Sequence, residues 1–290
     1  MTARIDAHHH LWRYNPEEYA WIGPGMEAIA RDFLPSELEA ELASGRMEGA
    51  VAVQARQSME ETDWLLDLAA ASPVIRGVVG WAPILAPEFA EILEKLKGAR
   101  KLKGLRHIVQ AEPDDEFVLR KDFNAGIAML DGSGLVYDIL IYERHLPAAI
   151  RFVDRHPNQV FVLDHLAKPR IKERSVEPWK AGLAALAKRE NVYCKLSGLV
   201  TEADWRNWTK DQLRPYTEAA LEAFGPARLM FGSDWPVCLL ACSYREWSRA
   251  AEELLARLSA SEKELVFGGV VSKVYSLESA EQPAPSAPQE

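Results

Sequence analysis

Eight apolar, strand-like runs recur along the chain and alternate with segments of helical periodicity, and this alternation restricts the fold more than any other feature. A strand followed by a helix or a long loop, repeated eight times in 290 residues, is typical of a (β/α)8 barrel. A doubly wound open sheet is the alternative, but the Gly-rich turn that usually follows its first strand is missing from this sequence. We therefore predict an α/β fold with a single (β/α)8 TIM-like barrel, whose strands are Arg4–Leu11, Gly49–Gln54, Ile75–Ala82, Leu102–Val109, Leu135–Tyr142, Val160–His165, Asn191–Leu196 and Arg228–Ser233.

Amphipathic segments fill the spaces between these strands. Three of them begin at a proline, which suits the first position of a helix because its missing N–H is not needed there. Two more helices are expected after the eighth strand, and Ser261 with Glu264 has the spacing of a capping box. We expect one barrel domain over residues 1–277 and a disordered tail over 278–290, which is mostly Pro, Ala, Ser and Glu. The predicted helices are Glu60–Ala71, Pro87–Lys97, Pro147–His156, Pro178–Arg189, Asp211–Phe224, Tyr244–Leu258 and Ser261–Tyr275.

The charge and cysteine content narrow the class of protein. Acidic residues outnumber basic ones by 43 to 34, and no stripe of Lys and Arg forms, so a nucleic-acid partner is not expected. Three cysteines, Cys194, Cys238 and Cys242, are too few for a disulfide framework or a complete metal site of their own. No signal peptide or membrane-spanning run is recognisable. We expect a reduced, cytoplasmic, soluble protein; its oligomeric state stays open.

The strand-like segment Ile5–Arg13 carries His8 and His10 two positions apart. Side chains alternate across a strand, so both imidazoles should point to one side, together with Asp6. Two converging imidazoles can bind a divalent metal or transfer protons to a substrate. The segment after it, Trp12–Asp32, is rich in Trp, Tyr, Pro and Gly and is expected to be a long loop near the active site.

Two other predicted strands also end in polar residues. The sixth ends in Asp164 and His165, and the eighth ends in Gly-Ser followed by Asp234. In a barrel of this kind the carboxyl ends of the strands form the active site. A single His or Asp there is readily explained as a hydrogen-bonded or turn-forming residue. Three strand ends with such residues are better explained by a shared function, because burying polar groups without a use is costly.

Three motifs resemble those of the amidohydrolase superfamily, and more narrowly its sugar-lactonase branch. They are Asp-Ala-His-His-His-Leu-Trp (6–12), Leu-Asp-His-Leu-Ala-Lys-Pro (163–169) and Phe-Gly-Ser-Asp-Trp-Pro (231–236). That branch includes L-fuconolactone and L-rhamnonolactone hydrolases, and hydrolases of pyrone dicarboxylate and sulfomuconolactone are relatives. The resemblance extends from about Arg4 to Tyr275.

The resemblance implies a role for each strand-end residue. His8 and His10 would be metal ligands, and Asp234 would both contact the metal and act as general base. The implied cofactor is one divalent ion, with zinc as the expected metal. His165 would be catalytic, orienting or protonating the lactone, or would complete the metal sphere. The fifth strand lacks the histidine ligand of many relatives and offers Tyr142 instead, so the metal could be weakly bound or dispensable.

Candidate substrate-binding residues lie at the ends of other strands. Strand alternation allows only one of Arg106 and His107 to face the barrel interior, and a surface ion pair is an equally good explanation for the arginine. Lys195 lies in a buried strand, which favours a binding or electrostatic role. Two further candidates, a hydrogen-bonding side chain and an apolar wall for a sugar ring, could equally be packing residues; they are Gln54 and Trp81.

These residues predict a lactonase that opens a sugar lactone such as L-fuconolactone to its aldonic acid, by attack of water on the ring carbonyl with Asp234 as general base. Only two cations, Arg106 and Lys195, are well placed at the strand ends, which disfavours a dicarboxylate or sulfonate lactone from aromatic catabolism. A metal-dependent decarboxylase on the same scaffold and a catalytically dead sugar-binding protein remain as alternatives.

Overall fold

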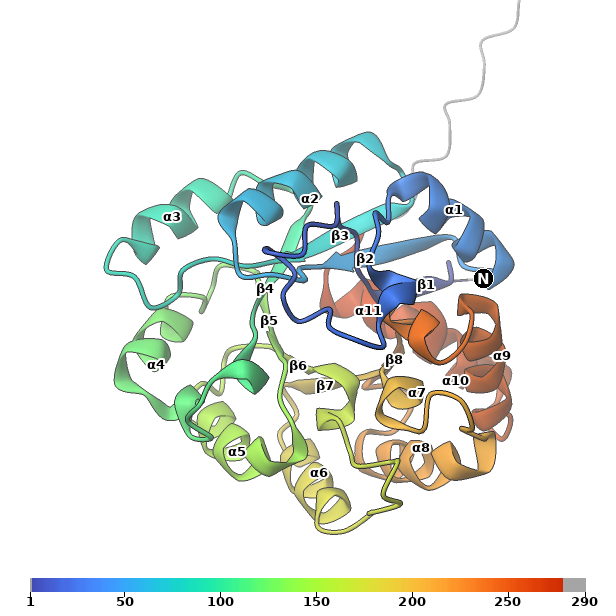
Figure 1. Ribbon diagram of the computed structural model, residues 1–290. Coiled ribbons are helices and arrows are strands. Elements are labelled where there is room, and N and C mark those ends of the chain that lie inside the picture. Colours follow the sequence, from blue (N-terminus) through green and yellow to red (C-terminus); the bar gives the residue numbers. More distant parts are fainter. Residues whose placement is uncertain (1, 279–290) are drawn as a thin grey trace, which may run out of the picture.

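The computed structural model describes residues 2–278, in which eight parallel strands form a barrel surrounded by helices (Figure 1). Each strand pairs with the next one along the chain, in the order β1 to β8. The predicted (β/α)8 barrel is confirmed, and the predicted tail 279–290 lies outside the described residues. The strands are β1 Ile5–His9, β2 Gly49–Val53, β3 Ile75–Gly80, β4 Leu102–His107, β5 Val136–Ile139, β6 Phe161–Leu163, β7 Val192–Leu196 and β8 Leu229–Phe231.

The barrel closes between β8 and β1, at the point where the histidine motif emerges. His9 forms a parallel bridge with Trp235. The His10 N–H donates to the Trp235 carbonyl at 2.6 Å, and the Asp234 N–H donates to the His8 carbonyl at 2.8 Å. The two segments that close the barrel therefore also carry three of the predicted site residues, His8, His10 and Asp234.

Helices follow most strands as predicted, with three differences. Three helices, those at 35–44, 121–128 and 199–202, were not predicted. The C-terminal segment is not one helix but three short pieces. Its capping box is formed by Ser259 with Glu262 rather than by Ser261 with Glu264, because the helix begins two residues earlier than predicted. The α-helices are α1 Pro35–Ser44, α2 Met59–Ala71, α3 Phe89–Leu96, α4 Lys121–Ala128, α5 Leu146–Asp154, α6 Trp179–Ala187, α7 Leu199–Glu202, α8 Lys210–Phe224, α9 Tyr244–Leu254, α10 Ala260–Glu264 and α11 Val270–Val274.

Short helical turns lie mainly in the connections that follow the strands. Most are 3-10 turns, and η7 is a π-helical turn between α10 and α11. They are η1 Glu27–Ile29, η2 Val109–Ala111, η3 Phe117–Leu119, η4 Glu143–His145, η5 Asp164–Ala167, η6 Val237–Leu240 and η7 Leu265–Gly269.

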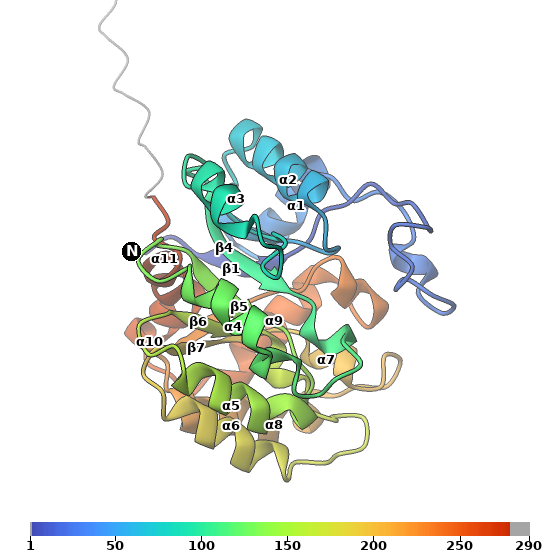
Figure 2. The same cartoon turned by 90° about the vertical axis from the view of Figure 1, so that its left-hand side faces the viewer.

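The inside of the barrel is packed with small aliphatic side chains, including Val51, Val79 and Val162. At the amino ends of the strands, α11 lies against this interior cluster (Figure 2). Its Val270 and Val271, followed by Tyr275, are buried in the cluster. The site therefore has to lie at the other end of the barrel.

The three cysteines are unpaired, and Cys194 and Cys238 are buried. Among residues 2–278, no helix has both the length and the apolar character that crossing a lipid bilayer requires.

The long loop after β1 lies at the carboxyl end of the barrel, where its turn η1 contacts η6, the turn that follows β8 (Figure 1). Its two ends are held together by Trp12 and Phe33, whose backbones exchange hydrogen bonds of 3.1 and 2.9 Å. Its middle is anchored by Tyr19, whose hydroxyl donates to the buried carboxylate of Glu61 at 3.0 Å. The same carboxylate accepts the backbone N–H groups of Ala55 and Arg56 at 3.0 and 2.9 Å. One buried acid thus joins this loop to the end of β2.

This anchor predicts a pH-dependent stability. Burial raises the pKa of Glu61 to about 7, above that of a carboxyl in the unfolded chain. The folded protein therefore binds the proton more tightly, and stability should fall as pH rises from about 4.5 to about 7, by up to roughly 3 kcal/mol. Glu61→Gln cannot ionise, so its urea unfolding free energy relative to the wild type should increase over that interval. Parallel pH curves for the two proteins would contradict this expectation.

Candidate active site

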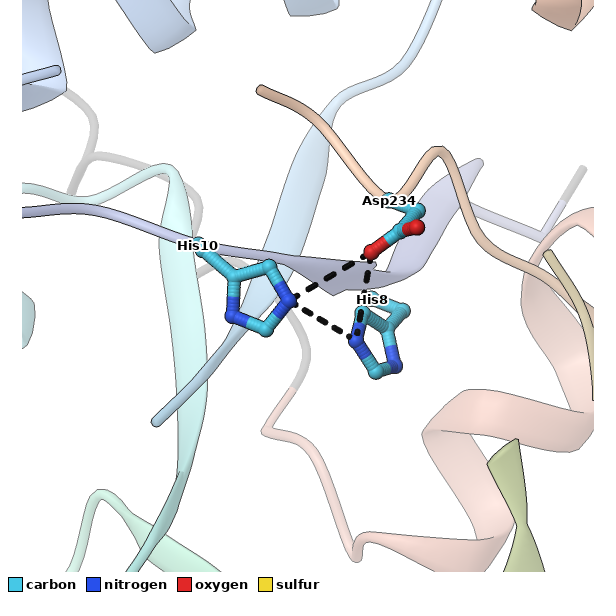
Figure 3. Close-up of side chains that lie close together, drawn as sticks. All are labelled: His8, His10 and Asp234. Atoms are coloured by element: carbon cyan, nitrogen blue, oxygen red, sulfur yellow. Dashed lines mark hydrogen bonds and ion pairs between the residues drawn. The ribbon is translucent and has the colours of Figure 1, made fainter. Parts of the chain in front are cut away.

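Four predicted residues meet at the carboxyl ends of β1, β6 and β8. The Nε2 atoms of His8 and His10 are 3.2 Å apart (Figure 3). Asp234 Oδ1 lies 3.4 Å from His10 Nε2 and 3.7 Å from His8 Nε2. His165 Nε2 is 3.9 Å from the same oxygen. The structure therefore brings the predicted metal and catalytic residues together.

A carboxylate beneath this cluster sets the geometry of the strand that carries it. Asp6 accepts hydrogen bonds from the backbone N–H of His8 at 3.0 Å and of Ser233 at 2.8 Å. The hydroxyl of Tyr244 donates to its other oxygen at 3.1 Å. Asp6 thus joins β1 to the segment after β8 and does not face the histidine nitrogens. A side chain at Gly232 would clash with this arrangement, because its Cβ would lie 2.8 Å from that of His8.

The surroundings of the two histidines determine which ring nitrogens carry protons. His10 Nδ1 lies 2.7 Å from the carbonyl oxygen of Val53, which can only accept, so Nδ1 bears the hydrogen. His8 Nδ1 faces Asp164 Oδ1 at 3.4 Å. Burial lowers the pKa of His8 well below its usual value, so the ring is neutral at pH 7. Both Nε2 atoms therefore present lone pairs toward each other and toward Asp234.

Three acceptor atoms this close repel one another unless a cation lies between them. Tetrahedral zinc with bonds of about 2.0–2.1 Å places its ligand atoms about 3.3 Å apart. The three distances of 3.2, 3.4 and 3.7 Å among His8, His10 and Asp234 are close to that value. Hydrogen bonding of the second ring nitrogen to a carbonyl or carboxylate is also usual for metal-binding histidines. These residues fit a divalent metal ion.

Behind the histidines, charged side chains form a buried network inside the barrel. Asp164 lies 2.9 Å from Arg106 Nη1 and 3.0 Å from Lys195 Nζ. Lys195 also pairs with Asp138, which accepts the Tyr275 hydroxyl at 2.8 Å. Burial raises the pKa of Asp138 to about 6, with Lys195 opposing it. Burial also acts to raise the pKa of Asp164, but Lys195 and its other partners outweigh it and hold the pKa well below its usual value.

Three of the predicted substrate-binding residues belong to this network. Arg106 and Lys195 were expected to bind substrate, but their side chains are 3% and 0% exposed and their donors are directed to buried acceptors. Gln54 is buried as well; its Nε2 donates to the Arg106 carbonyl at 3.1 Å and its Oε1 accepts from Arg106 at 3.2 Å. These residues position the site from behind. The sequence did not identify Asp138, Asp164 or Tyr275 as their partners.

His165 lies in a left-handed turn and not, as predicted, at the end of β6, which stops at Leu163. The four residues from His165 to Lys168 all have positive φ, between 49° and 59°. Non-glycine residues pay roughly 1–2 kcal/mol each for this conformation. The turn is held by a hydrogen bond from the Trp179 indole to the Leu166 carbonyl at 2.6 Å. Strain retained in this way is often found at functional sites.

The imidazole of His165 is fixed by residues that follow β7. Its Nδ1 is 2.8 Å from Ser197 Oγ. Gly198 packs directly on the ring: a Cβ at that position would lie 2.8 Å from His165 Cγ, and the backbone φ is +70°. Glycine is therefore needed there for both space and conformation.

The remaining candidates are placed apart from the histidines. His107 turns outward, as alternation allows: its Nε2 lies 2.6 Å from Glu112 and its ring stacks on Phe117 at 4.9 Å, so a substrate contact is not supported. Tyr142 lies beyond β5, on the wall of a cavity of about 1090 Å³. Trp81 is half-buried just after β3, and its indole N–H has no partner among the described residues. Tyr142 and Trp81 remain candidate wall residues.

Comparison with known proteins gives consistent matches over the whole barrel. The amidohydrolase family matches residues 5–277. An L-fucono-1,5-lactonase from Burkholderia multivorans is 45% identical over 285 residues, which cover 94% of this chain and 96% of that protein. An L-fucono-1,5-lactonase from Burkholderia ambifaria is 36% identical over 284 residues, which cover 96% of this chain and 97% of that protein. The solved structure of a Burkholderia multivorans amidohydrolase with bound zinc has a TM-score of 0.91 at 45% identity, covering 95% of this chain and 100% of that one.

The buried network predicts a large effect of a single charge removal. Lys195→Met should lower the free energy of unfolding by about 3–5 kcal/mol, because Asp138 would remain buried without a cation and Asp164 would keep only Arg106. Urea unfolding measures this. As a control, Lys210→Met removes an exposed pair with Glu253 and should leave the midpoint nearly unchanged.

Adding Asp138→Asn to the Lys195→Met variant removes the buried carboxylate that has lost its cation, so part of the lost stability should return. Equal midpoints for the Lys195→Met and Lys210→Met single variants would show that the network does not contribute to stability.

Proposed function

Because this chain belongs to the amidohydrolase family, we propose that it is a lactonase that hydrolyses a sugar lactone, with L-fucono-1,5-lactone as the first candidate, to the corresponding aldonic acid. The observation that carries this proposal is the convergence of His8 Nε2, His10 Nε2 and Asp234 Oδ1 at one point of the barrel mouth. The two curated L-fucono-1,5-lactonases, which match nearly the full chain, support the choice of substrate. Neither the site nor the comparisons favour a decarboxylase.

Asp234 is the proposed general base. Burial opposes its ionisation, but the adjacent histidines His165 and His10 outweigh burial and lower its pKa. It is therefore an anion at neutral pH and can take a proton from the attacking water. The hydroxide attacks the ring carbonyl, and a tetrahedral intermediate with a negative oxygen forms. When the ring C–O bond breaks, the proton held by Asp234 passes to the leaving oxygen, which yields the hydroxy acid.

His165 is the proposed stabiliser of the developing negative charge. Burial lowers its pKa to about 4, so the ring is neutral at pH 7. If the Ser197 hydroxyl donates to Nδ1 across 2.8 Å, the proton of the ring lies on Nε2. That N–H points toward the Asp234 side of the site and can donate to the carbonyl oxygen as its charge grows.

The proposed metal is zinc, held by His8, His10 and Asp234. When bound, such an ion supplies Lewis acidity that polarises a carbonyl and lowers the pKa of water. The absence of a histidine on β5 leaves the ion with few protein ligands, since β5 presents Asp138 to Lys195 instead. We therefore propose a site that binds zinc reversibly.

The general-base role predicts a large loss of rate in Asp234→Asn. The variant keeps the shape of the side chain but cannot take the proton, so kcat/KM for L-fucono-1,5-lactone should fall by about 10²–10⁴-fold. A pH-indicator assay of acid release measures this. Asp211→Asn, which changes an aspartate whose side chain is 91% exposed, is the matched control and should keep the wild-type rate. Full activity in the Asp234→Asn variant would rule the mechanism out.

The metal assignment predicts a change in affinity that does not depend on activity. His10→Gln should weaken zinc binding by at least about tenfold. Competition with a chromogenic chelator measures the affinity, and cobalt in place of zinc should show the absorption of a low-symmetry site. His156→Gln is the control, because that histidine bonds Asn124 on the outside of the barrel. Equal affinity in the wild type and the His10→Gln variant would show that the ion binds elsewhere.

A further inference from the structure

A large cavity lies over the segments that follow β5, β6 and β7, and Lys168 on its wall is three residues from the catalytic His165. Its volume is about 1090 Å³, which is ample for a monosaccharide-sized ligand. The mechanism uses none of its residues. The wall combines aromatic rings with charged groups, among them Tyr142, Lys168, Arg170, Glu202, Trp205 and Arg206.

Lys168 connects this cavity to the catalytic residues. It is the last residue of the left-handed turn that begins at His165, and its N–H donates to the His165 carbonyl at 2.8 Å. In a turn closed by such an i to i+3 bond, the first and last side chains lie on the same side. One short turn therefore carries both His165, whose Nε2 lies 3.9 Å from Asp234 Oδ1, and Lys168, which lines the cavity wall.

The ammonium group of Lys168 is only loosely paired. Its Nζ lies 3.7 Å from Glu202 Oε1, longer than a good hydrogen bond, and 5.6 Å from the centre of the Tyr142 ring. In the part of the chain that the structure describes, neither Lys168 nor Glu202 forms another ion pair. Their side chains are 19% and 24% exposed, so both are partly desolvated yet accessible from the cavity. The Lys168 ammonium and the Glu202 carboxylate therefore lie side by side, and each can still form hydrogen bonds with a ligand.

We propose that Lys168 and Glu202 are the specificity-determining pair that recognises adjacent hydroxyl groups of the lactone ring. This inference rests on the proposed lactonase function and names the part of the substrate that the cavity binds. Two neighbouring hydroxyls offer an acceptor oxygen and a donor hydrogen on adjacent carbons, which matches an ammonium and a carboxylate 3.7 Å apart. Tyr142 and Trp205 line the same cavity and can supply apolar contact for the C–H side of the ring.

A pair of lactones of equal ring size tests the proposal. L-Fucono-1,5-lactone carries ring hydroxyls, and δ-valerolactone carries none. Lys168→Met and Glu202→Gln should each lower kcat/KM for the sugar lactone by about 10- to 100-fold, since a hydrogen bond to a charged group is lost. The rate with δ-valerolactone should change by less than about threefold. Lys180→Met, which removes an exposed pair with Glu222, is the control and should leave both rates unchanged.

Other outcomes would overturn the inference. Equal losses with both lactones would mean that the pair acts on the reacting carbonyl or on the fold, and no loss with either would mean that it does not contact the substrate. Circular dichroism and the conservative Glu202→Asp variant, which should restore part of the preference, separate recognition from misfolding.

Binding measurements distinguish this inference from the proposed function. In an Asp234→Asn background, calorimetry should show that Lys168→Met weakens the binding of L-fucono-1,5-lactone at least tenfold. Unchanged affinity would overturn the role of Lys168 even if the wild type is a lactonase. Lack of wild-type turnover of any lactone would instead overturn the proposed function, while a loss of affinity in the Lys168→Met protein would still support the recognition pair.

Discussion

One buried carboxylate, that of Asp164, links the strands on which the site depends. It contacts His8 on β1, Arg106 on β4 and Lys195 on β7. Removing charged groups from water costs several kcal/mol for each ion unless the partners satisfy one another closely. The positions of these four side chains are therefore determined together, and moving one would leave another unpaired. This requirement fixes the relative placement of strands that are far apart in sequence.

The same requirement sets the chemistry of the site. His8 and His10 are oriented by groups of the barrel itself, the Asp164 carboxylate and the Val53 carbonyl. Their lone pairs therefore point to the mouth without help from a substrate. A site arranged in advance pays little to reorganise when a metal or a transition state is bound. The cations behind it, Arg106 and Lys195, pair with the buried carboxylates of Asp164 and Asp138.

The sequence alone was sufficient to predict the barrel fold and the group of His and Asp residues at its mouth. Apolar runs and their alternation with helices predicted all eight strands, and polar residues at strand ends predicted His8, His10, His165 and Asp234 as one group. Pairing across the barrel interior could not be predicted in this way, because it depends on which residues of distant strands come to the same height. Lys195 was recognised as unusual, but its partner on β5 was not.

Unusual backbone conformation is the second feature that could not be predicted from the sequence. Four residues in left-handed conformation without a glycine contradict every local preference, so the turn from His165 to Lys168 could be found only in the structure. His165 and Lys168 are the first and last residues of one hydrogen-bonded turn. The catalytic imidazole and the cavity lysine therefore cannot move independently. A substitution that relaxed Leu166 or Ala167 toward ordinary backbone angles would displace both side chains. Tight packing of Gly198 on the imidazole resists such relaxation. The strain is therefore the physical link between the reacting centre and the wall of the cavity.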